Sequence, residues 1–250
     1  MSTKRVRACV ASAALCLAVL AIAPAAASAA TQGIDVSRFQ GAIDWAKVGE
    51  TEIQFAFAQA SRGSGEDCAV VPRRCGADEF YAANYEGARD AQIRVGPYHR
   101  AFPGGHGPKG QKRDARAEAR VFIRNVGKLR KRDLRPALDV ETPFGGLGHH
   151  ALRRWVRIWL HRVRKNLHAR PIVYTNTSSW QATGNTTKFA RAGHPLWVAN
   201  FGVKRPSVPA ANWNGQGWSI WQYTSSGKVK GIHGNVDKDR LRSGFGNVGV

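Results

Sequence analysis

Acidic residues are scarce in this chain. Its 250 residues include 17 Asp and Glu against 38 Lys and Arg, which gives a formal charge of +21 at pH 7. An excess of positive charge on this scale is expected to attract polyanions. Nucleic acid is not the expected partner, because the aromatic residues that would stack on bases lie on apolar helix stripes and not among the cations.

Long apolar runs are confined to residues 8–23. This run follows Lys4, Arg5 and Arg7, and small residues at 27–31 offer cleavage after Ala29 or Ala30, the pattern of a secretory signal peptide. A membrane anchor is the alternative, but the run is short of the roughly 20 residues that a span requires, and no basic stop follows it. We predict a signal peptide over residues 1–30 and a secreted, extracellular protein, without stable membrane insertion, that can associate with the cell wall.

Cysteine is also rare. Cys9 and Cys16 fall within the predicted signal peptide, which leaves Cys68 and Cys75. In an exported protein these two are expected to form a disulfide that closes a small loop. A metal site would need further ligands at a recognisable spacing, and the eight histidines contain no H-x-x-x-H pair. No metal site is therefore predicted.

No Pro-, Ser- or Gly-rich linker and no internal repeat divide residues 31–250. We therefore predict that these residues form a single domain. Predicted strands alternate with predicted helices, which indicates an α/β fold with a mostly parallel sheet and helices outside it, in a whole or partial barrel. The strands are expected at 33–39, 55–60, 94–101, 135–141, 171–176, 195–201 and 218–225. The helices are expected at 44–50, 78–92, 111–131 and 150–168.

The helices expected at 111–131 and 150–168 carry much of the positive charge, on the faces opposite their apolar stripes. Two interpretations remain open. The cations can form ordinary solvated faces, or they can form a surface that binds anionic wall polymers. Removing residues 1–30 takes away three cations and no acid, so the rest of the chain still carries a formal charge of +18.

Two carboxylates end the apolar stretch at 137–144, which reads ALDVETPF. Residues i and i+2 of a strand point to the same face, so Asp139 and Glu141 are expected to point the same way, with Val140 opposite. Two neighbouring carboxylates repel, and the less solvated one keeps its proton to higher pH, as a general acid requires. The alternative is that both simply neutralise nearby arginines. No G-x-S-x-G motif suggests a serine nucleophile instead.

Six segments, in order and at ordinary spacing, resemble those of glycoside hydrolase family 25, the Chalaropsis-type lysozymes. Together they cover about residues 33–241. They read GIDVSRFQGAIDWAKV, YAANYEGARDAQIRVGPYH, PALDVE, PIVYTN, PLWVANF and WSIWQYTSSGKVKGIHGNVDKDRL.

The resemblance implies a flattened, irregular, TIM-like β/α barrel of eight strands and about five helices. It implies a lysozyme that cleaves the β-1,4 bond between N-acetylmuramic acid and N-acetylglucosamine in peptidoglycan, as a monomer without a cofactor. Carried over by position, Glu141 is the general acid, Asp139 its partner toward the substrate's acetamido group, and Asp35 and Asp237 line the same catalytic cleft. The expected substrate-binding positions are Tyr98, Tyr174, Trp197, Trp221 and Gln222.

Some positions depart from the family pattern. Gln59 and Arg62 stand where Lys and Glu are common, which replaces an acid near the cleft by a base. Asp239 and Leu241 stand where Asn and Phe are usual, a change that we interpret as packing.

The mechanism also stays open between attack by the substrate's acetamido oxygen, by water and by a carboxylate. A non-catalytic binding module and a protein that acts on cells by charge alone are the alternative functions.

Overall fold

The computed structural model describes residues 30–64 and 76–250. The predicted signal peptide, up to residue 29, and the predicted disulfide between Cys68 and Cys75 fall outside the described residues. Among those that are described, no helix is long and apolar enough to cross a membrane.

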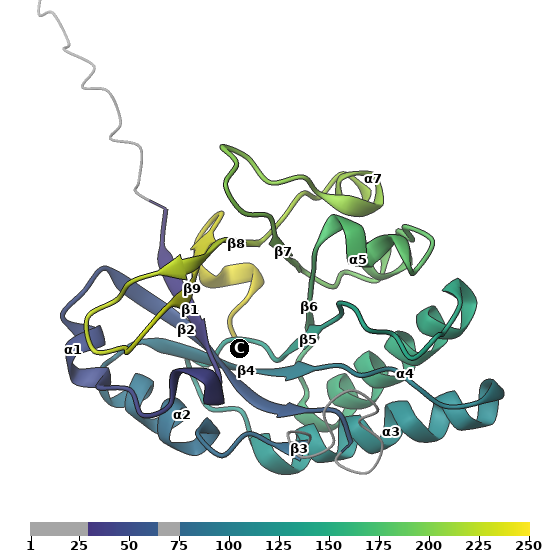
Figure 1. The fold of residues 1–250 in the computed structure, drawn as a ribbon, viewed down its shortest axis with the longest axis horizontal. Helices are drawn as coiled ribbons and strands as arrows, with labels where there is room; N and C mark the ends of the chain where they lie inside the picture. Colours follow the sequence, from purple (N-terminus) through teal and green to yellow (C-terminus); the bar gives the residue numbers. More distant parts are fainter. Residues whose placement is uncertain (1–29, 65–75) are drawn as a thin grey trace, which may run out of the picture.

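Eight strands close into a barrel (Figure 1). Neighbours around it follow the order β1, β9, β8, β7, β6, β5, β4 and β2, and β2 pairs with β1 to complete the ring. The two-residue strand β3 (Gly76–Ala77) pairs with the outer end of β2. The barrel strands are β1 (Gln32–Val36), β2 (Ile53–Arg62), β4 (Arg94–Arg100), β5 (Ala137–Asp139), β6 (Ile172–Thr175), β7 (Leu196–Ala199), β8 (Ile220–Gly227) and β9 (Val236–Leu241).

The predicted barrel is confirmed, and its strands up to β8 lie where the sequence pattern indicates. These seven barrel strands pair with one another in parallel. The eighth strand, β9, pairs antiparallel with both β1 and β8. Asp237 lies within β9, opposite Asp35 of β1, so both carboxyl groups come from paired strands. The barrel is therefore closed by a strand that reverses direction after the β8–β9 connection.

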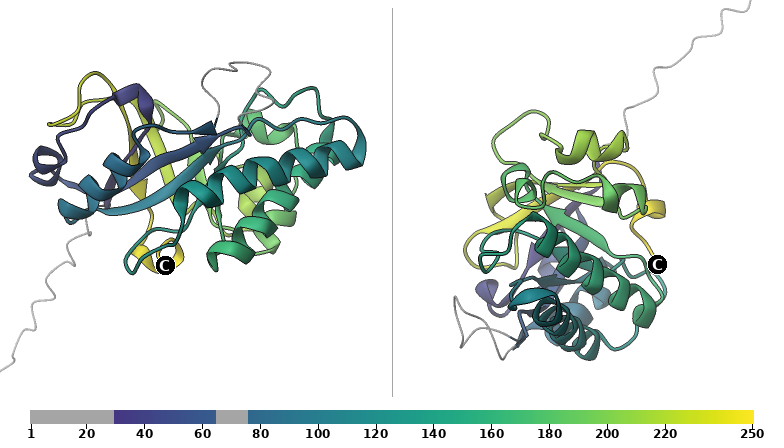
Figure 2. Two further views of the ribbon diagram at one scale, coloured as in Figure 1. Left: turned by 90° about the horizontal axis from the view of Figure 1, so that it is seen from below. Right: turned by 90° about the vertical axis from the view of Figure 1, so that its right-hand side faces the viewer.

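The helices cover the barrel unevenly. The two long helices α3 (Gly107–Val126) and α4 (His149–Leu167) lie side by side along one flank (Figures 1 and 2). The described residues contain seven helical segments against the expected five or so, the shorter ones being α1 (Trp45–Gly49), α2 (Tyr81–Asp90), α5 (Thr177–Gln181), α6 (Lys188–Arg191) and α7 (Pro209–Asn214). Positive φ angles at 210–213 make α7 a left-handed turn.

Helix α3 begins and ends about four residues before the predicted bounds. Pro108 stands in its first turn, where the missing N–H is no loss. The helix ends at Gly127, whose φ of 66° is a conformation that glycine adopts without strain. Ala115, Ala119 and Phe122 of the predicted apolar stripe are buried, which confirms this part of the stripe.

Alternation along β2 explains the presence of two cores. Phe55 and Phe57 point into the barrel, and the ring of Phe57 stacks on Trp197 with 4.5 Å between centroids. Ala56, Ala58 and their neighbours point outward into the layer between strands and helices. The small outward residues let the helices approach the sheet, while the large inward rings fill the barrel below its mouth.

Candidate active site

A cavity of about 370 Å³ opens at the carboxyl ends of the parallel strands. This is the end of a β/α barrel where residues from several strands converge. Eight of the nine predicted catalytic and substrate-binding residues line the cavity, namely Asp35, Asp139, Glu141, Asp237, Tyr98, Tyr174, Trp197 and Gln222. The barrel therefore brings these expected side chains together.

Trp221 is the exception, because it is not among the residues that line the cavity. Successive strand residues point to opposite faces, so Gln222 takes the interior position and Trp221 the exterior one. The indole Nε1 of Trp221 donates to the carbonyl oxygen of Asn200 at 2.8 Å, and its ring packs against Trp218 and Tyr223. The structure places Trp221 in the outer core and not in the cleft.

Arg100, at the end of β4, lies between the two predicted catalytic carboxylates. Its Nε is 3.5 Å from Oδ2 of Asp139 and 3.3 Å from Oε1 of Glu141. Its terminal nitrogens also donate to the carbonyl oxygens of Glu141 and Thr142. One guanidinium thus orients both carboxylates and fixes the backbone that follows β5.

The two carboxylates differ in their exposure. The Asp139 side chain is 9% exposed and that of Glu141 is 33% exposed, so Glu141 is the more accessible of two carboxyl groups that both line the cavity. Burial raises the pKa of Asp139 well above its usual range, and the positive charges of Arg100 and Arg62 oppose that rise. The site therefore holds one buried and one accessible carboxyl group on the same face of the chain.

A second group of acids lies across the cavity, where β1 pairs with β9. Burial raises the pKa of Asp35 well above its usual range, and the charges of Asp237 and Asp239 raise it further. Burial, followed by the charge of Glu141, raises the pKa of Asp237 to about 6. Burial and the charge of Asp237 likewise raise the pKa of Asp239, so Asp35, Asp237 and Asp239 form an acid cluster in which proximity favours the protonated forms.

The sequence predicts a packing role for Asp239, but the structure places this residue in the acid cluster with Asp35 and Asp237. It is fully buried, and its Oδ1 accepts a hydrogen bond from the indole of Trp197 at 2.8 Å. The signal was available, because Asp237 and Asp239 have the same i, i+2 spacing as Asp139 and Glu141 and so share a face.

Polar side chains connect the acid cluster to the cavity wall. Gln222 donates from Nε2 to Oδ2 of Asp35 at 2.7 Å and accepts from the hydroxyl of Tyr174 at 2.9 Å. On the opposite wall, Gln59 donates to the hydroxyl of Tyr98 at 3.0 Å. These bonds hold the side chains in place before any ligand arrives, which favours binding.

Two of the four departures from the family pattern lie at this cavity. Gln59 and Arg62 line it, and the Arg62 guanidinium sits 5.1 Å from the centre of the Phe102 ring, as does that of Arg100. Burial and the neighbouring charge of Arg100 lower the pKa of Arg62 from its ordinary value. A base therefore stands close to Asp139 at a position where an acid is common.

His99 points away from the cavity, although it lies between Tyr98 and Arg100. Its ring is fully buried between the strands and α3, where Nδ1 lies 2.8 Å from the Ser61 hydroxyl and Nε2 lies 2.8 Å from Oε2 of Glu118. Burial lowers the pKa of His99 to about 3 and raises that of Glu118 well above its usual range, so burial favours the neutral form of both groups. The serine is buried too, so this group supports β4 from behind and presents no accessible nucleophile.

Together the residues describe a site for glycoside hydrolysis. Such reactions use two carboxyl groups at the scissile bond, one of which delivers a proton. Across the two described ranges, no group of three or more His, Cys, Asp or Glu residues has an arrangement suited to a metal ion. The fold and site thus define the class, a barrel hydrolase with carboxylate chemistry.

Comparison with known proteins identifies the family. The model of glycosyl hydrolases family 25 matches residues 34–232. Lysozyme M1 of Streptomyces globisporus is 32% identical over 217 residues, or 84% of this chain and 67% of that protein. The N,O-diacetylmuramidase of Chalaropsis sp. is 27% identical over 82% of this chain and 95% of its own length.

A solved structure agrees with this assignment. The lysozyme of Streptomyces coelicolor superposes with a TM-score of 0.73 and 31% identity, covering 86% of this chain and 94% of that one. The chain belongs to glycosyl hydrolases family 25, and it is a glycoside hydrolase that acts on peptidoglycan.

Proposed function

We propose that this chain is a secreted N-acetylmuramidase that hydrolyses the β-1,4 bond between N-acetylmuramic acid and N-acetylglucosamine. The observation that carries the proposal is the pair of carboxylates on Arg100. Glu141 is accessible in the cavity, and Asp139 is buried two residues before it. Family membership supports peptidoglycan as the polymer.

In the proposed reaction, Glu141 donates its proton to the glycosidic oxygen while the bond between that oxygen and the anomeric carbon breaks. The departing sugar leaves as an alcohol. Water then supplies a hydroxyl group to the anomeric carbon, and its remaining proton returns to Glu141. Asp139, held by Arg100 at 3.5 Å, is proposed to orient the 2-acetamido group of the substrate beside that carbon.

The acid cluster has a separate proposed part. Asp35 and Asp237 line the cavity opposite Glu141, and burial together with neighbouring carboxylates raises the pKa of both. Partly protonated carboxyls can both donate to and accept from sugar hydroxyls. Tyr98, Tyr174, Trp197 and Gln222 are proposed to complete the substrate-binding wall.

Product analysis tests the bond that is cleaved. Purified peptidoglycan is digested, the products are reduced with borohydride, and their sugar ends are identified by mass spectrometry. N-acetylmuramitol ends are expected. N-acetylglucosaminitol ends would reassign the bond, and peptide fragments without new reducing ends would contradict glycoside hydrolysis. Export is tested separately, by whether the protein recovered outside producing cells begins at residue 30 or 31.

A further inference from the structure

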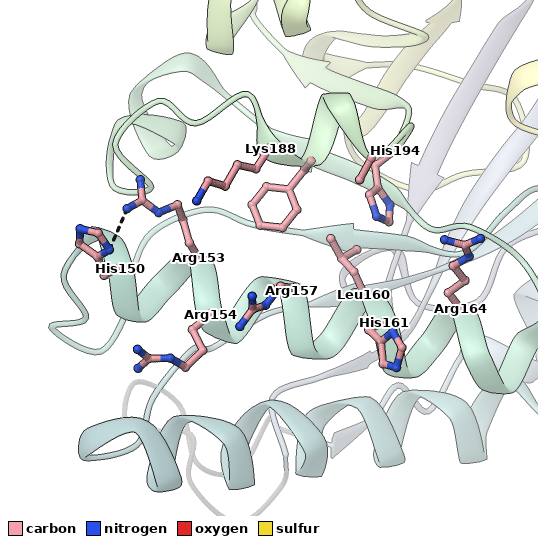
Figure 3. A pocket seen from close by; sticks show the side chains of 11 residues that line it. His150, Arg153, Arg154, Arg157, Leu160, His161, Arg164, Lys188 and His194 are labelled. Atoms are coloured by element: carbon pink, nitrogen blue, oxygen red, sulfur yellow. Dashed lines mark hydrogen bonds between the residues drawn. The ribbon is translucent and has the colours of Figure 1, made fainter.

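A second cavity, of about 360 Å³, lies away from the barrel mouth, between α4 and the segment around α6 (Figure 3). It shares no lining residue with the cavity that holds Glu141. One wall is the outer face of α4, and the other is Lys188 to His194. The lining residues are His150, Arg153, Arg154, Arg157, Leu160, His161, Arg164, Lys188, Phe189, Ala192 and His194.

The charge of this cavity has one sign. Four arginines and one lysine line it, and no lining residue is an acid. Among the parts of the chain that the structure describes, none of these five cations forms an ion pair with a carboxylate.

Some of these cationic side chains are held by hydrogen bonds, and others have N–H donors that bond to no described residue. Arg153 donates to the carbonyl oxygen of Thr183 at 3.1 Å, and Arg154 donates to Oε1 of Gln111 at 2.9 Å. By contrast, no hydrogen bond joins the side chains of Arg157, Arg164 or Lys188 to any other described residue. Those three are available to a ligand.

The floor of the cavity is buried. Leu160, Phe189 and His194 are each less than a tenth exposed, and His194 is fixed by its Nδ1, 2.8 Å from the carbonyl oxygen of Pro171. Burial lowers the pKa of His194, so this ring is neutral near pH 7 and the positive charge comes from Arg and Lys. Like charges around a hollow repel, and an anion that enters it would relieve that repulsion.

The row of cations is long. From Arg153 to Arg164 the helix rises about 16 Å at 1.5 Å per residue. A single phosphate touches only one or two of these side chains, whereas a chain of phosphodiesters can follow the whole row. Guanidinium groups are well suited to phosphate oxygens, because their fork of donors binds two oxygens at once.

We propose that the cavity between α4 and α6 binds a phosphodiester-linked polymer of the cell wall, of the kind attached to peptidoglycan. The site would hold the enzyme on its insoluble substrate, and that role rests on the proposed function, whereas the binding itself does not. A nucleic acid fits less well, because Phe189 is the one Phe, Tyr or Trp in the lining and it is buried, so no exposed phenyl, phenol or indole ring is there to stack on bases.

The test measures binding of a fluorescent glycerol-phosphate oligomer to the full chain at several salt concentrations. The variant Arg157→Gln with Lys188→Gln removes two charges that have no partner in the described structure. Its matched control, Arg116→Gln with Lys165→Gln, removes two exposed charges from α3 and α4 that do not line the cavity. We expect the first variant to bind about tenfold more weakly or worse, because two charge-assisted contacts are lost, and the control to change binding less than about twofold.

Further arms separate the possible ligands. Inorganic phosphate should bind far more weakly than the oligomer, and the salt dependence of oligomer binding should be less steep for the cavity variant than for wild type. Equal weakening in both double variants would overturn the proposal in favour of general surface charge. Equal affinity for single-stranded DNA of the same phosphate count would overturn the assignment to a wall polymer. Both variants should cleave a small soluble muropeptide at the wild-type rate, so a failure of binding is distinguishable from a failure of catalysis.

Discussion

Arg100 and Glu141 are joined at two places, through the side chain and through the backbone. The guanidinium Nε lies 3.3 Å from Oε1 of Glu141, and a terminal nitrogen of the same group donates to the Glu141 carbonyl oxygen at 2.9 Å. A residue on β4 therefore positions a carboxylate that follows β5. Because Glu141 lies beyond the last residue of its strand, the strand ladder alone does not hold it.

Replacing Arg100 by Lys should impair turnover more than substrate binding. Lysine keeps the charge but cannot contact two carboxylates and two carbonyls at once. We expect kcat on soluble peptidoglycan fragments to fall about 10- to 100-fold, the range for loss of positioning of a catalytic group. KM should change less than about threefold, since the charge is retained.

A surface variant controls for the chemistry of the Arg100 substitution. Arg130 pairs with Glu86 at an exposed position far from the cavity. Arg130→Lys should leave both constants within about twofold of wild type, because exposed ion pairs contribute little. Equal losses in the two variants would show that Arg100 has no specific part.

Arg62→Gln should move the acidic limb of the pH–activity profile upward. The positive charge of Arg62 lowers the pKa of Asp139 against the larger effect of burial. Without that charge Asp139 takes up its proton at higher pH, so the activity that depends on ionised Asp139 is lost at higher pH as the solution is acidified. The measurement is kcat/KM against pH for both proteins. An acidic limb that stays in place or moves to lower pH would show that the charge of Arg62 does not lower the pKa of Asp139.

The acid cluster should make stability fall as pH rises. Asp237 has its pKa raised from 3.8 to about 6 in the folded protein, so the folded state holds its proton more tightly than the unfolded state does. Its contribution is therefore fully present below 3.8 and is lost as pH rises through about 6. Asp237→Asn removes this titration, and its Tm should fall less than that of wild type over this window. If the Tm of wild type and of Asp237→Asn changed in parallel over this window, the pKa of Asp237 would not be raised in the folded protein.

The buried pair behind β4 gives a stability prediction. Glu118 accepts from the backbone N–H of Phe102 and contacts His99, and burial raises its pKa and so favours the protonated carboxyl. Gln can make the same hydrogen bonds without charge, so Glu118→Gln should lower the free energy of unfolding by less than about 1 kcal/mol. Glu118→Ala leaves buried groups unpaired and should lower it by about 2–4 kcal/mol. Denaturant unfolding of the two variants decides whether the group is neutral, since a large loss for Gln would mean that the native carboxyl is ionised.

Much of the barrel could be predicted from the sequence. The strand period of two residues and the helix period of about 3.6 residues are both clear wherever one face of the element is buried. The strand β9 could not be predicted, since its sequence VDKDRL places four consecutive charged residues between two apolar ones, a pattern that an exposed loop also shows. It becomes a strand because the free edges of β1 and β8 need partners. Tertiary pairing decides such a segment.

The site was only partly predictable for a similar reason. The D-x-E spacing identified Asp139 and Glu141 as neighbours on one face, and the cavity contains both. Arg100 carried no comparable signal, because it is one of 38 basic residues and its importance depends on where β4 lies relative to β5. Residues that act through their position next to another strand are visible only once the strands are paired.

The central claim is that Glu141 is the proton donor for hydrolysis of the glycan. Release of reducing ends from purified peptidoglycan, measured for wild type beside Glu141→Gln, tests it most directly. The substitution removes the acid and barely changes the large positive charge of the protein. We expect steady release by wild type and a rate at least about 100-fold lower for the variant, as for loss of a general acid. Equal release by the two proteins would mean that another group donates the proton.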